Sequence, residues 1–269
     1  MKRFLILLIA ATSSPFSLAD SLTFGIVPQQ SASRLAEQWT PLLNQLSEEL
    51  GQKVVFTTAV DIPTFEQRLA NGDYDFAYMN PYHYTVFSQS PGYQAIAKAK
   101  NKKIRGIIVV RKDSGIDSPN QLQGTTLAFP SPAAFAASVL TRDYLAQQHI
   151  DFTPAYVRSH DSVYLSVANG FYPAGGGVMR TFNSIPAELR AQLTPIWTTE
   201  AYTPHAIAAH PDLPQSTVDA FQRLLVKLDQ TTDGKVQLKP LNIEGFEAAS
   251  DSDWNDVRSL RIDVLENEE

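Results

Sequence analysis

Strand-like and helix-like segments alternate along almost the whole chain, and this alternation restricts the fold to the α/β class. An apolar strand over residues 22–28 leads into a helix in which leucines and a tryptophan recur at helical spacing. A second strand over 53–58 leads into a second helix over 62–70, which stops at Asn71-Gly72. Alternation of this kind is typical of parallel sheets that are covered by helices.

The middle of the chain forms a second unit with the same pattern. Strands are predicted over 126–129, 156–158 and 175–178, and two further strands, over 195–200 and 205–209, lead back to the first unit. We therefore predict a two-lobed α/β protein in which each lobe is a sheet flanked by helices. Lobe 1 comprises residues 20–108 and 204–269, and lobe 2 (109–203) is inserted in it. The two crossovers between the lobes form a hinge, and the cleft between the lobes is the expected ligand site.

Polar and aromatic side chains gather where one predicted strand of lobe 1 ends. The strand covers residues 74–78 and stops at Asn80-Pro81, because proline has no amide hydrogen and forces the preceding residue out of helical geometry. An open α/β sheet presents its ligand contacts just past the carboxyl ends of its strands. Tyr78, Asn80 and Tyr82 are therefore candidate ligand contacts. The alternatives are half-buried core tyrosines and, for Asn80, a turn-forming residue.

The first residues predict an export signal. Lys2 and Arg3 precede an apolar run over 4–11, and Ser17-Leu18-Ala19 offers the small residues that a signal peptidase reads. The run is too short to span a bilayer, so we expect residues 1–19 to be cleaved and the protein to lie in the periplasm. The alternative is a buried N-terminal helix. The absence of cysteine from the chain excludes disulfides, thiolate metal sites and a lipid anchor.

Charge and residue pattern argue against several functional classes. The formal net charge is −6, and cleavage of the signal would remove further positive charge, which argues against nucleic acid and anionic membranes as partners. The 5 histidines are scattered and have no partners at helical spacing, so no metal site is predicted. No Gly-x-Ser-x-Gly elbow is present. We expect a monomer with no cofactor and no catalytic residue.

Four short motifs follow one another in a defined order. They are Asp75-Phe76-Ala77-Tyr78-Met79-Asn80-Pro81, the Gly-x-x-Leu-Ala-Phe sequence at 124–129, Ser159-His160-Asp161 followed by a helix to Asn169-Gly170, and His210-Pro211-Asp212-Leu213-Pro214. Together with the order of the elements, these motifs resemble the periplasmic phosphate-, phosphite- and phosphonate-binding proteins of ABC importers. The resemblance covers residues 21–230. It implies a two-lobed fold of the periplasmic binding protein type, whose lobes close around a small molecule.

The resemblance also implies which residues contact the ligand. Family members clamp an oxyanion with tyrosine hydroxyls after the lobe 1 strand, which correspond to Tyr78 and Tyr82, with Asn80 beside them. A family histidine in the next loop of lobe 2 corresponds to His160. Asp161 follows this histidine, and it either contacts the ligand or caps the helix that begins there. A helix N-terminus in lobe 2 adds free amide hydrogens and partial positive charge.

The chain departs from the family pattern at the oxyanion site. A Ser-Thr-Ser-Gly cluster of the family falls on Ala134-Phe135-Ala136-Ala137, so every side-chain hydroxyl of the cluster is missing. Ser131, Ser138 and backbone amides replace these donors only in part. Losing three donors at about 1.5–3 kcal/mol each lowers oxyanion affinity by several orders of magnitude. We expect an altered ligand, and Phe135 and Phe171 favour a more apolar or aromatic molecule.

These observations predict a non-catalytic periplasmic solute-binding protein. Its ligand, an oxyanion or a small organic molecule, is trapped between the lobes and delivered to an ABC permease. The alternative is the input subunit of a membrane sensor such as a histidine kinase or a cyclase. A cofactor-biosynthesis enzyme on the same fold is a minor alternative. A non-binding structural role is favoured if Phe135 and Phe171 fill the cleft.

Overall fold

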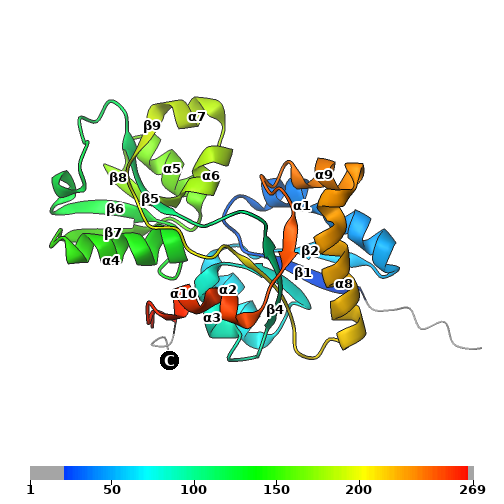
Figure 1. The fold of residues 1–269 in the computed structure, drawn as a ribbon. Helices are drawn as coiled ribbons and strands as arrows, with labels where there is room; N and C mark the ends of the chain where they lie inside the picture. Colours follow the sequence, from blue (N-terminus) through cyan, green and yellow to red (C-terminus); the bar gives the residue numbers. More distant parts are fainter. Residues whose placement is uncertain (1–20, 266–269) are drawn as a thin grey trace, which may run out of the picture.

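The computed structural model describes residues 21–265, which form two lobes that lie side by side (Figure 1). Each lobe contains one β-sheet with helices packed against it, so the predicted two-lobed α/β architecture is confirmed. The predicted signal peptide (1–19) and the acidic residues 266–269 lie outside the described residues. Within residues 21–265, no helix is long and apolar enough to cross a membrane.

The sheet of lobe 1 has six strands in the order β11-β4-β10-β3-β1-β2. Its strands are β1 (Leu22–Ile26), β2 (Val54–Thr57), β3 (Phe76–Met79), β4 (Gln94–Ala99), β10 (Ala206–Ala209) and β11 (Phe246–Ala248). Strand β1 is parallel to β2 and β3, as the alternating sequence pattern predicts. Strand β10 is antiparallel to β3 and β4, because it enters the sheet as the chain returns from lobe 2.

The helices of lobe 1 form two groups on opposite sides of this sheet (Figure 1). They are α1 (Ala32–Leu50), α2 (Ile62–Asn71), α3 (Pro81–Phe87), α8 (Gln215–Lys227), α9 (Thr232–Leu238) and α10 (Asn255–Arg258), with 3₁₀ turns at η3 (Leu228–Gln230) and η4 (Asp251–Trp254). Helix α1 contacts α8 and α9, whereas α3 contacts α2 and α10. The side chains of Ser31 and Asp61 cap the starts of α1 and α2, and Gly51 and Gly72 end these helices with positive φ.

The sheet of lobe 2 has five strands in the order β7-β6-β8-β5-β9. Its strands are β5 (Gly106–Arg111), β6 (Thr125–Phe129), β7 (Phe152–Tyr156), β8 (Ala174–Val178) and β9 (Leu193–Thr198). Its helical elements are the 3₁₀ turn η1 (Pro119–Leu122), the π-helical segment η2 (Phe135–Val139), α4 (Leu140–Gln147), α5 (His160–Ala168), α6 (Met179–Ser184) and α7 (Ala187–Gln192). Strand β5 pairs with β8 and β9 from its first residues onward. The sheet of lobe 2 therefore begins at Gly106, whereas the sequence placed residues 106–108 in lobe 1.

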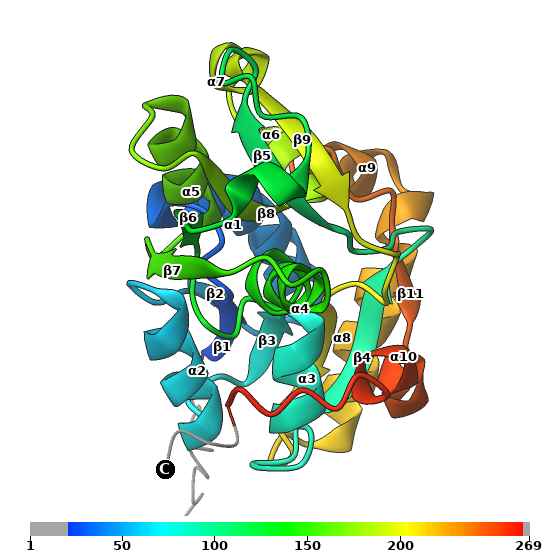
Figure 2. The same ribbon diagram turned by 90° about the vertical axis from the view of Figure 1, so that its left-hand side faces the viewer.

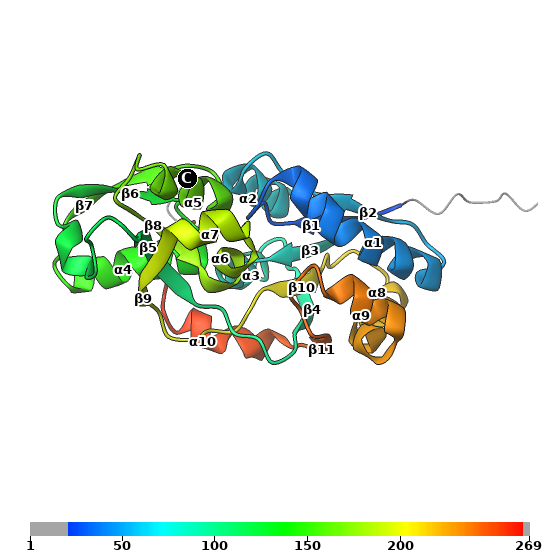
Figure 3. The same cartoon turned by 90° about the horizontal axis from the view of Figure 1, so that it is seen from above.

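Two segments connect the lobes and run beside each other (Figure 3). One leads from β4 to β5, and the other leads from β9 back to β10. Ile104 and Tyr202 join them in an isolated antiparallel bridge, with N···O distances of 2.9 and 3.0 Å. The two predicted crossovers are therefore present, and this bridge ties them together at the hinge.

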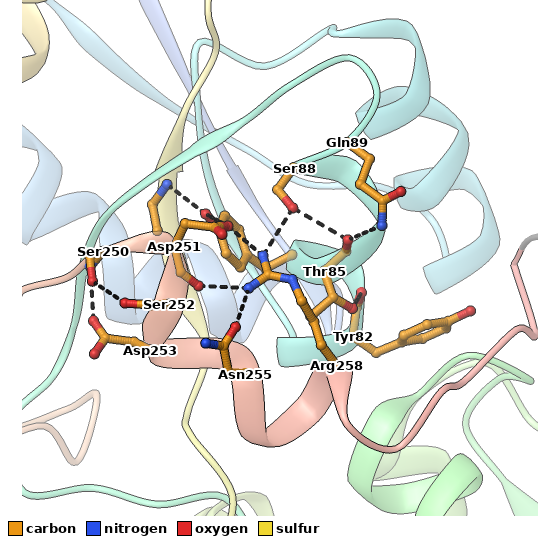
Figure 4. Close-up of polar contacts among 12 residues, drawn as sticks. Tyr82, Thr85, Ser88, Gln89, Ser250, Asp251, Ser252, Asp253, Asn255 and Arg258 are labelled. Atoms are coloured by element: carbon orange, nitrogen blue, oxygen red, sulfur yellow. Dashed lines mark hydrogen bonds and ion pairs between the residues drawn. The ribbon is translucent and has the colours of Figure 1, made fainter.

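The C-terminal segment is attached to α3 through Arg258 (Figure 4). The Arg258 guanidinium forms an ion pair with the Asp251 carboxylate and donates to the Asp251 carbonyl oxygen at 2.8 Å. It also lies 5.9 Å from the centre of the Tyr84 ring on α3, and the Tyr84 hydroxyl donates to the Asp251 carboxylate at 2.9 Å. Three residues therefore share one network, which holds α10 against α3.

Replacing Arg258 with methionine is expected to lower the free energy of unfolding by about 1–2 kcal/mol. The substitution keeps much of the aliphatic chain but removes a partly exposed ion pair and a cation–π contact, each worth about 1 kcal/mol or less. Urea denaturation measures the effect. Arg223→Met on the exposed face of α8 is the matched control, with a change of at most about 0.5 kcal/mol. Equal losses for the two variants would contradict the proposed attachment.

Candidate functional site

The two lobes are in direct contact along the predicted cleft. The His160 amide of lobe 2 donates to the Gln29 carbonyl oxygen of lobe 1 at 3.0 Å. The Arg180 guanidinium donates to Gln29 Oε1 at 2.6 Å. The Asn80 side-chain amide donates to the Ala133 carbonyl oxygen at 3.3 Å. These hydrogen bonds across the cleft describe a closed arrangement of the lobes.

Asn80 has two roles at the cleft, and its local sequence explains both. Its side-chain oxygen accepts the His83 amide hydrogen at 2.8 Å and so caps α3, which begins at Pro81. Proline is well suited to the first helical position because the amide hydrogen it lacks would have no partner there. The cap leaves the Asn80 NH₂ group free to reach lobe 2. Asn80 therefore caps a helix, where the sequence alternative was a turn-forming residue, and it is also a residue of the cleft.

Phe135 and its alanine neighbours, on which the sequence resemblance places the hydroxyl cluster, are packed at the cleft. The segment 133–137 is buried, and the Phe135 side chain is 1% exposed. Its ring meets the Tyr202 ring edge-on, with centroids 5.6 Å apart. The space left here, lined by Gln29, Asn80, Ala134, Phe135 and His160 among others, is about 10 Å³. That is roughly the room for one water molecule.

Two glycines of the sheet allow this packing. A Cβ atom on Gly176 would lie 1.9 Å from the Ala137 carbonyl oxygen, and one on Gly106 would lie 2.0 Å from that of Ala136. Segment η2 therefore rests directly on β5 and β8, and the glycine run at 175–177 serves close packing within lobe 2. Figure 2 shows α4, which continues η2, lying over α3 of lobe 1, and η2 itself contacts α3.

Ser131 and Ser138, the predicted replacement donors, are both buried beside this segment. Neither hydroxyl has a hydrogen-bond partner within the described residues. A buried hydroxyl without a partner costs about 1–3 kcal/mol. Neither serine lines the small space at Phe135, so the closed form does not present their hydroxyls to that position.

Phe171 lies outside the cleft. Its side chain is 75% exposed, and it lines neither the small space at Phe135 nor the larger cavity described below. Of the two phenylalanines that the sequence suggested as cleft-filling residues, only Phe135 occupies the cleft.

His160 lies at the lobe interface as the first residue of α5. Ser159, rather than Asp161, caps this helix, because the Ser159 hydroxyl accepts the Ser162 amide hydrogen at 3.1 Å. The His160 side chain is 1% exposed. Burial, assisted by the nearby Arg180 cation, lowers the pKa of His160 to about 3. The imidazole is therefore neutral at physiological pH.

Asp161 is half-buried beside His160. Burial raises the pKa of its carboxyl group, and the Arg34 cation of lobe 1 opposes that shift. Arg34 also donates to the Ser184 carbonyl oxygen of lobe 2. Asp161 therefore lies where Arg34 of lobe 1 approaches lobe 2, and it does not line either cavity of the cleft.

A chain of polar contacts runs from Arg180 through Gln29 to His205 and Tyr78. Because Gln29 Oε1 accepts from Arg180, the Gln29 NH₂ group faces His205 Nε2 at a distance of 3.0 Å. An NH₂ group only donates, so His205 Nε2 must accept and the ring must be neutral. Burial, helped by Arg180, lowers the pKa of His205 in agreement. The Tyr78 ring stacks on His205 with centroids 4.9 Å apart, and burial raises the pKa of Tyr78.

A larger cavity of about 190 Å³ lies next to this chain, beside the two crossovers. We call it the hinge cavity. Its lining residues are Tyr78, Ala99, Lys102, Lys103, Ile104, Arg105, Met179, Arg180, Asn183, Pro204, His205, Asn242 and Ile243. Tyr78 is the predicted site residue that reaches it. Four basic residues and no acidic residue contribute to the lining.

Tyr82 differs from its predicted position. It is 2% exposed, and its hydroxyl accepts the Leu265 amide hydrogen at 2.9 Å. In Figure 4 its side chain points away from the Arg258 network, and it lines neither cavity of the cleft. Tyr82 lies on α3, which turns the chain away from the strand end, so its ring faces the C-terminal segment instead of lobe 2.

Three residues of the cleft are not predicted from the sequence, namely Gln29, Arg180 and His205. Gln29 and Arg180 follow the carboxyl ends of β1 and β8, and His205 precedes the antiparallel strand β10. The strand-end rule that selected Tyr78 and Asn80 applies to the first two equally. Within residues 21–265, no group of three or more histidine, aspartate or glutamate side chains is placed to hold a metal ion.

Comparison with known proteins identifies relatives over most of the chain. A sequence model of the family "ABC transporter, phosphonate, periplasmic substrate-binding protein" matches residues 24–254. The phosphonates-binding periplasmic protein of Escherichia coli K12 is 25% identical over 258 residues, which cover 90% of this chain and 76% of the relative. The structure of PhnD1 from Prochlorococcus marinus in complex with methylphosphonate superimposes with a TM-score of 0.82 at 19% identity, over 89% of this chain and 96% of that one.

A sensor protein matches part of the chain. The tetrathionate sensor histidine kinase TtrS of Salmonella typhimurium is 23% identical over 130 residues, which cover 45% of this chain and 22% of the kinase.

Proposed function

Because the chain belongs to the family of periplasmic substrate-binding proteins of phosphonate ABC transporters, we propose that it traps a small organic molecule between its lobes and delivers it to an ABC permease. Closure is favoured when a ligand contacts both lobes at once. The family is one of binding proteins, as the sequence analysis predicted. Export by the signal at residues 1–19, and action as a monomer, are parts of the same proposal.

The position of Phe135 supports an altered ligand. The sequence resemblance places the family's hydroxyl cluster on Phe135 and the neighbouring alanines, and the closed lobes leave about 10 Å³ beside them. A simple phosphorus oxyanion bound at this position would have to separate the lobes or displace the Phe135 ring. It would also lack three hydroxyl donors that are worth about 1.5–3 kcal/mol each when they bind a charged group. Inorganic phosphate and methylphosphonate are therefore poor ligands in this proposal.

A thermal-shift screen of residues 20–269 tests the proposal. We expect an organic ligand at 100 times its Kd to stabilise the folded protein by about 2.7 kcal/mol, which corresponds to a rise in Tm of about 5 °C or more. Phosphate and methylphosphonate at 1 mM are expected to leave Tm unchanged. Low-micromolar binding of either anion would refute the altered ligand. Stabilisation by no compound in a broad panel would favour the structural role instead.

A role as the input subunit of a membrane sensor is the second candidate, and the partial match to a sensor kinase favours it. The two roles differ in the membrane partner. Stimulation of a co-encoded permease's ATPase activity by the liganded protein supports import. Stimulation of a co-encoded kinase or cyclase, with no effect on an ATPase, supports sensing.

A further inference from the structure

We propose that the hinge cavity binds a small organic dianion, in which an oxyanion group is joined to an apolar body about as large as a benzene ring. This inference deepens the proposed function and rests on it, since it states where between the lobes the ligand lies and what its chemistry is. The inherited oxyanion position is filled by Phe135, whereas the hinge cavity has about 190 Å³ of space.

The charges around the cavity favour an anion. Lys102 is paired with the Glu244 carboxylate at 3.0 Å. Lys103, Arg105 and Arg180 form no ion pair with a carboxylate in the part of the chain that the structure describes: Arg105 donates to the Thr199 carbonyl oxygen at 2.9 Å, and Arg180 donates to the Gln29 side-chain amide. Three unneutralised cations thus converge on one cavity in a protein with 28 acidic and 22 basic residues. An oxyanion group with two charges would neutralise most of this local excess.

The position and hydrogen bonding of Arg180 suit it to bind an oxyanion. Its side chain is half-buried, and the hydrogen bond to Gln29 holds one end of the guanidinium in place. A guanidinium has five N–H donors in a rigid fork, so the remaining donors are available to an oxyanion. A half-buried cation also interacts more strongly with an anion than an exposed one, because less solvent screens it.

The rest of the lining suits an apolar body. Met179 and Ile243 face the cavity from opposite lobes, and Ile104 and Pro204 come from the crossovers. Tyr78 adds an aromatic ring, and its hydroxyl forms no hydrogen bond with any residue of the described range, so it is available as a donor. A cavity of roughly 150 Å³ accommodates benzene. The hinge cavity is therefore large enough for an aromatic ring with a small charged group, and the exposed Lys103 and Arg105 leave it open to solvent.

A ligand in this cavity would couple binding to closure. Met179, Arg180 and Asn183 belong to α6 of lobe 2, whereas Tyr78 and Ile243 belong to lobe 1. The closed form alone brings the two sets together. A dianion here is consequently expected to favour closure, although it occupies a different position from the inherited oxyanion.

Isothermal titration calorimetry on residues 20–269 tests the inference with four probes. Phenylphosphonate and phthalate are aromatic dianions, methylphosphonate supplies the charged group alone, and benzyl alcohol supplies the ring alone. We expect at least one aromatic dianion to bind ten-fold or more tightly than either partial probe, and the comparison of the two dianions distinguishes a phosphonate from a dicarboxylate. Absence of binding by both dianions overturns the inference, whereas the broad screen decides the proposed function separately.

Charge variants locate the binding. The double variant Lys103→Gln/Arg105→Gln is expected to weaken the dianion at least ten-fold and to reduce its sensitivity to salt. Lys53→Gln/Arg223→Gln removes the same charge from exposed positions outside the cavity lining, and we expect it to bind like the wild type. Equal affinity in all three proteins overturns the inference while leaving the proposed function standing.

Methionine methyl signals give a second readout that does not depend on a charge variant. The chain has 3 methionines, of which Met179 lines the cavity and Met79 is buried in β3. In ¹³C-methyl-methionine NMR, the dianion is expected to shift the Met179 signal, assigned with Met179→Leu, more than the Met79 signal. Binding without a shift at Met179 overturns the inference.

Discussion

Restoring the hydroxyl cluster is expected to raise the affinity for methylphosphonate by at least three orders of magnitude. The triple variant Ala134→Ser/Phe135→Thr/Ala136→Ser removes the ring that fills the inherited position and returns three hydroxyl donors. At about 1.5–3 kcal/mol for each bond to a charged group, the donors supply roughly 4.5–9 kcal/mol, which is a factor of a thousand or more in Kd. A Kd above 1 mM in the wild type would fall to the micromolar range in the variant, as measured by calorimetry.

The single variant Phe135→Ala separates space from hydrogen bonding. It opens the same position without donors, and we expect less than a thirty-fold gain in affinity. Removing a buried phenylalanine ring costs about 3–5 kcal/mol of unfolding free energy, so circular dichroism must first show that both variants are folded at the temperature of titration. A folded triple variant that does not bind methylphosphonate would show that the missing hydroxyls are not what excludes this ligand.

The elements of the fold were largely predictable because their signals are local. The apolar periodicity of α1 and the polar caps and glycines at helix ends depend on residues within a few positions of each other. Helix α3 was missed although Asn80-Pro81 carries a cap and a first-turn proline, because its seven residues are too few to show a clear apolar period. Strand β5 is placed by its partners β8 and β9, which lie far along the chain. Local sequence therefore did not show which lobe it joins.

The residues of the candidate site were predictable only where they lie next to a strand end or a helix start that the local sequence reveals. Asn80, Phe135 and His160 meet at the cleft, because each lies next to a strand end or helix start that the sequence reveals. The position of Tyr82 depends on the course of α3 after Pro81. The contact of Gln29 with Arg180 joins residues that are 151 positions apart. Its formation depends on the relative orientation of the lobes, for which the sequence contains no local signal.

Acidification is expected to lower the unfolding free energy of the protein from about pH 6.5 downward, which is above the pH range in which carboxylates titrate. The pKa of His160 is about 3 in the folded protein and about 6.5 in the unfolded chain. The unfolded chain therefore binds the extra proton between these values, so the contribution of His160 is complete above pH 6.5 and is lost as pH falls toward 3. The slope approaches about 1.4 kcal/mol per pH unit, or about 2 kcal/mol between pH 6.5 and 4.5. His205, whose pKa is also lowered, acts in the same direction.

Denaturant titrations at several pH values, with two histidine variants, isolate this effect. His160→Asn removes the titrating group, so its unfolding free energy is expected to fall less steeply between pH 6.5 and 4.5 than that of the wild type. His149→Asn replaces an exposed histidine that adopts positive φ, a conformation that asparagine tolerates, and is expected to keep the wild-type slope. The half-buried Asp161, whose raised pKa opposes the trend, is present in all three proteins and cancels in the comparison. Parallel slopes in all three would mean that His160 titrates alike in the folded and unfolded states, which would contradict the effect expected from its burial.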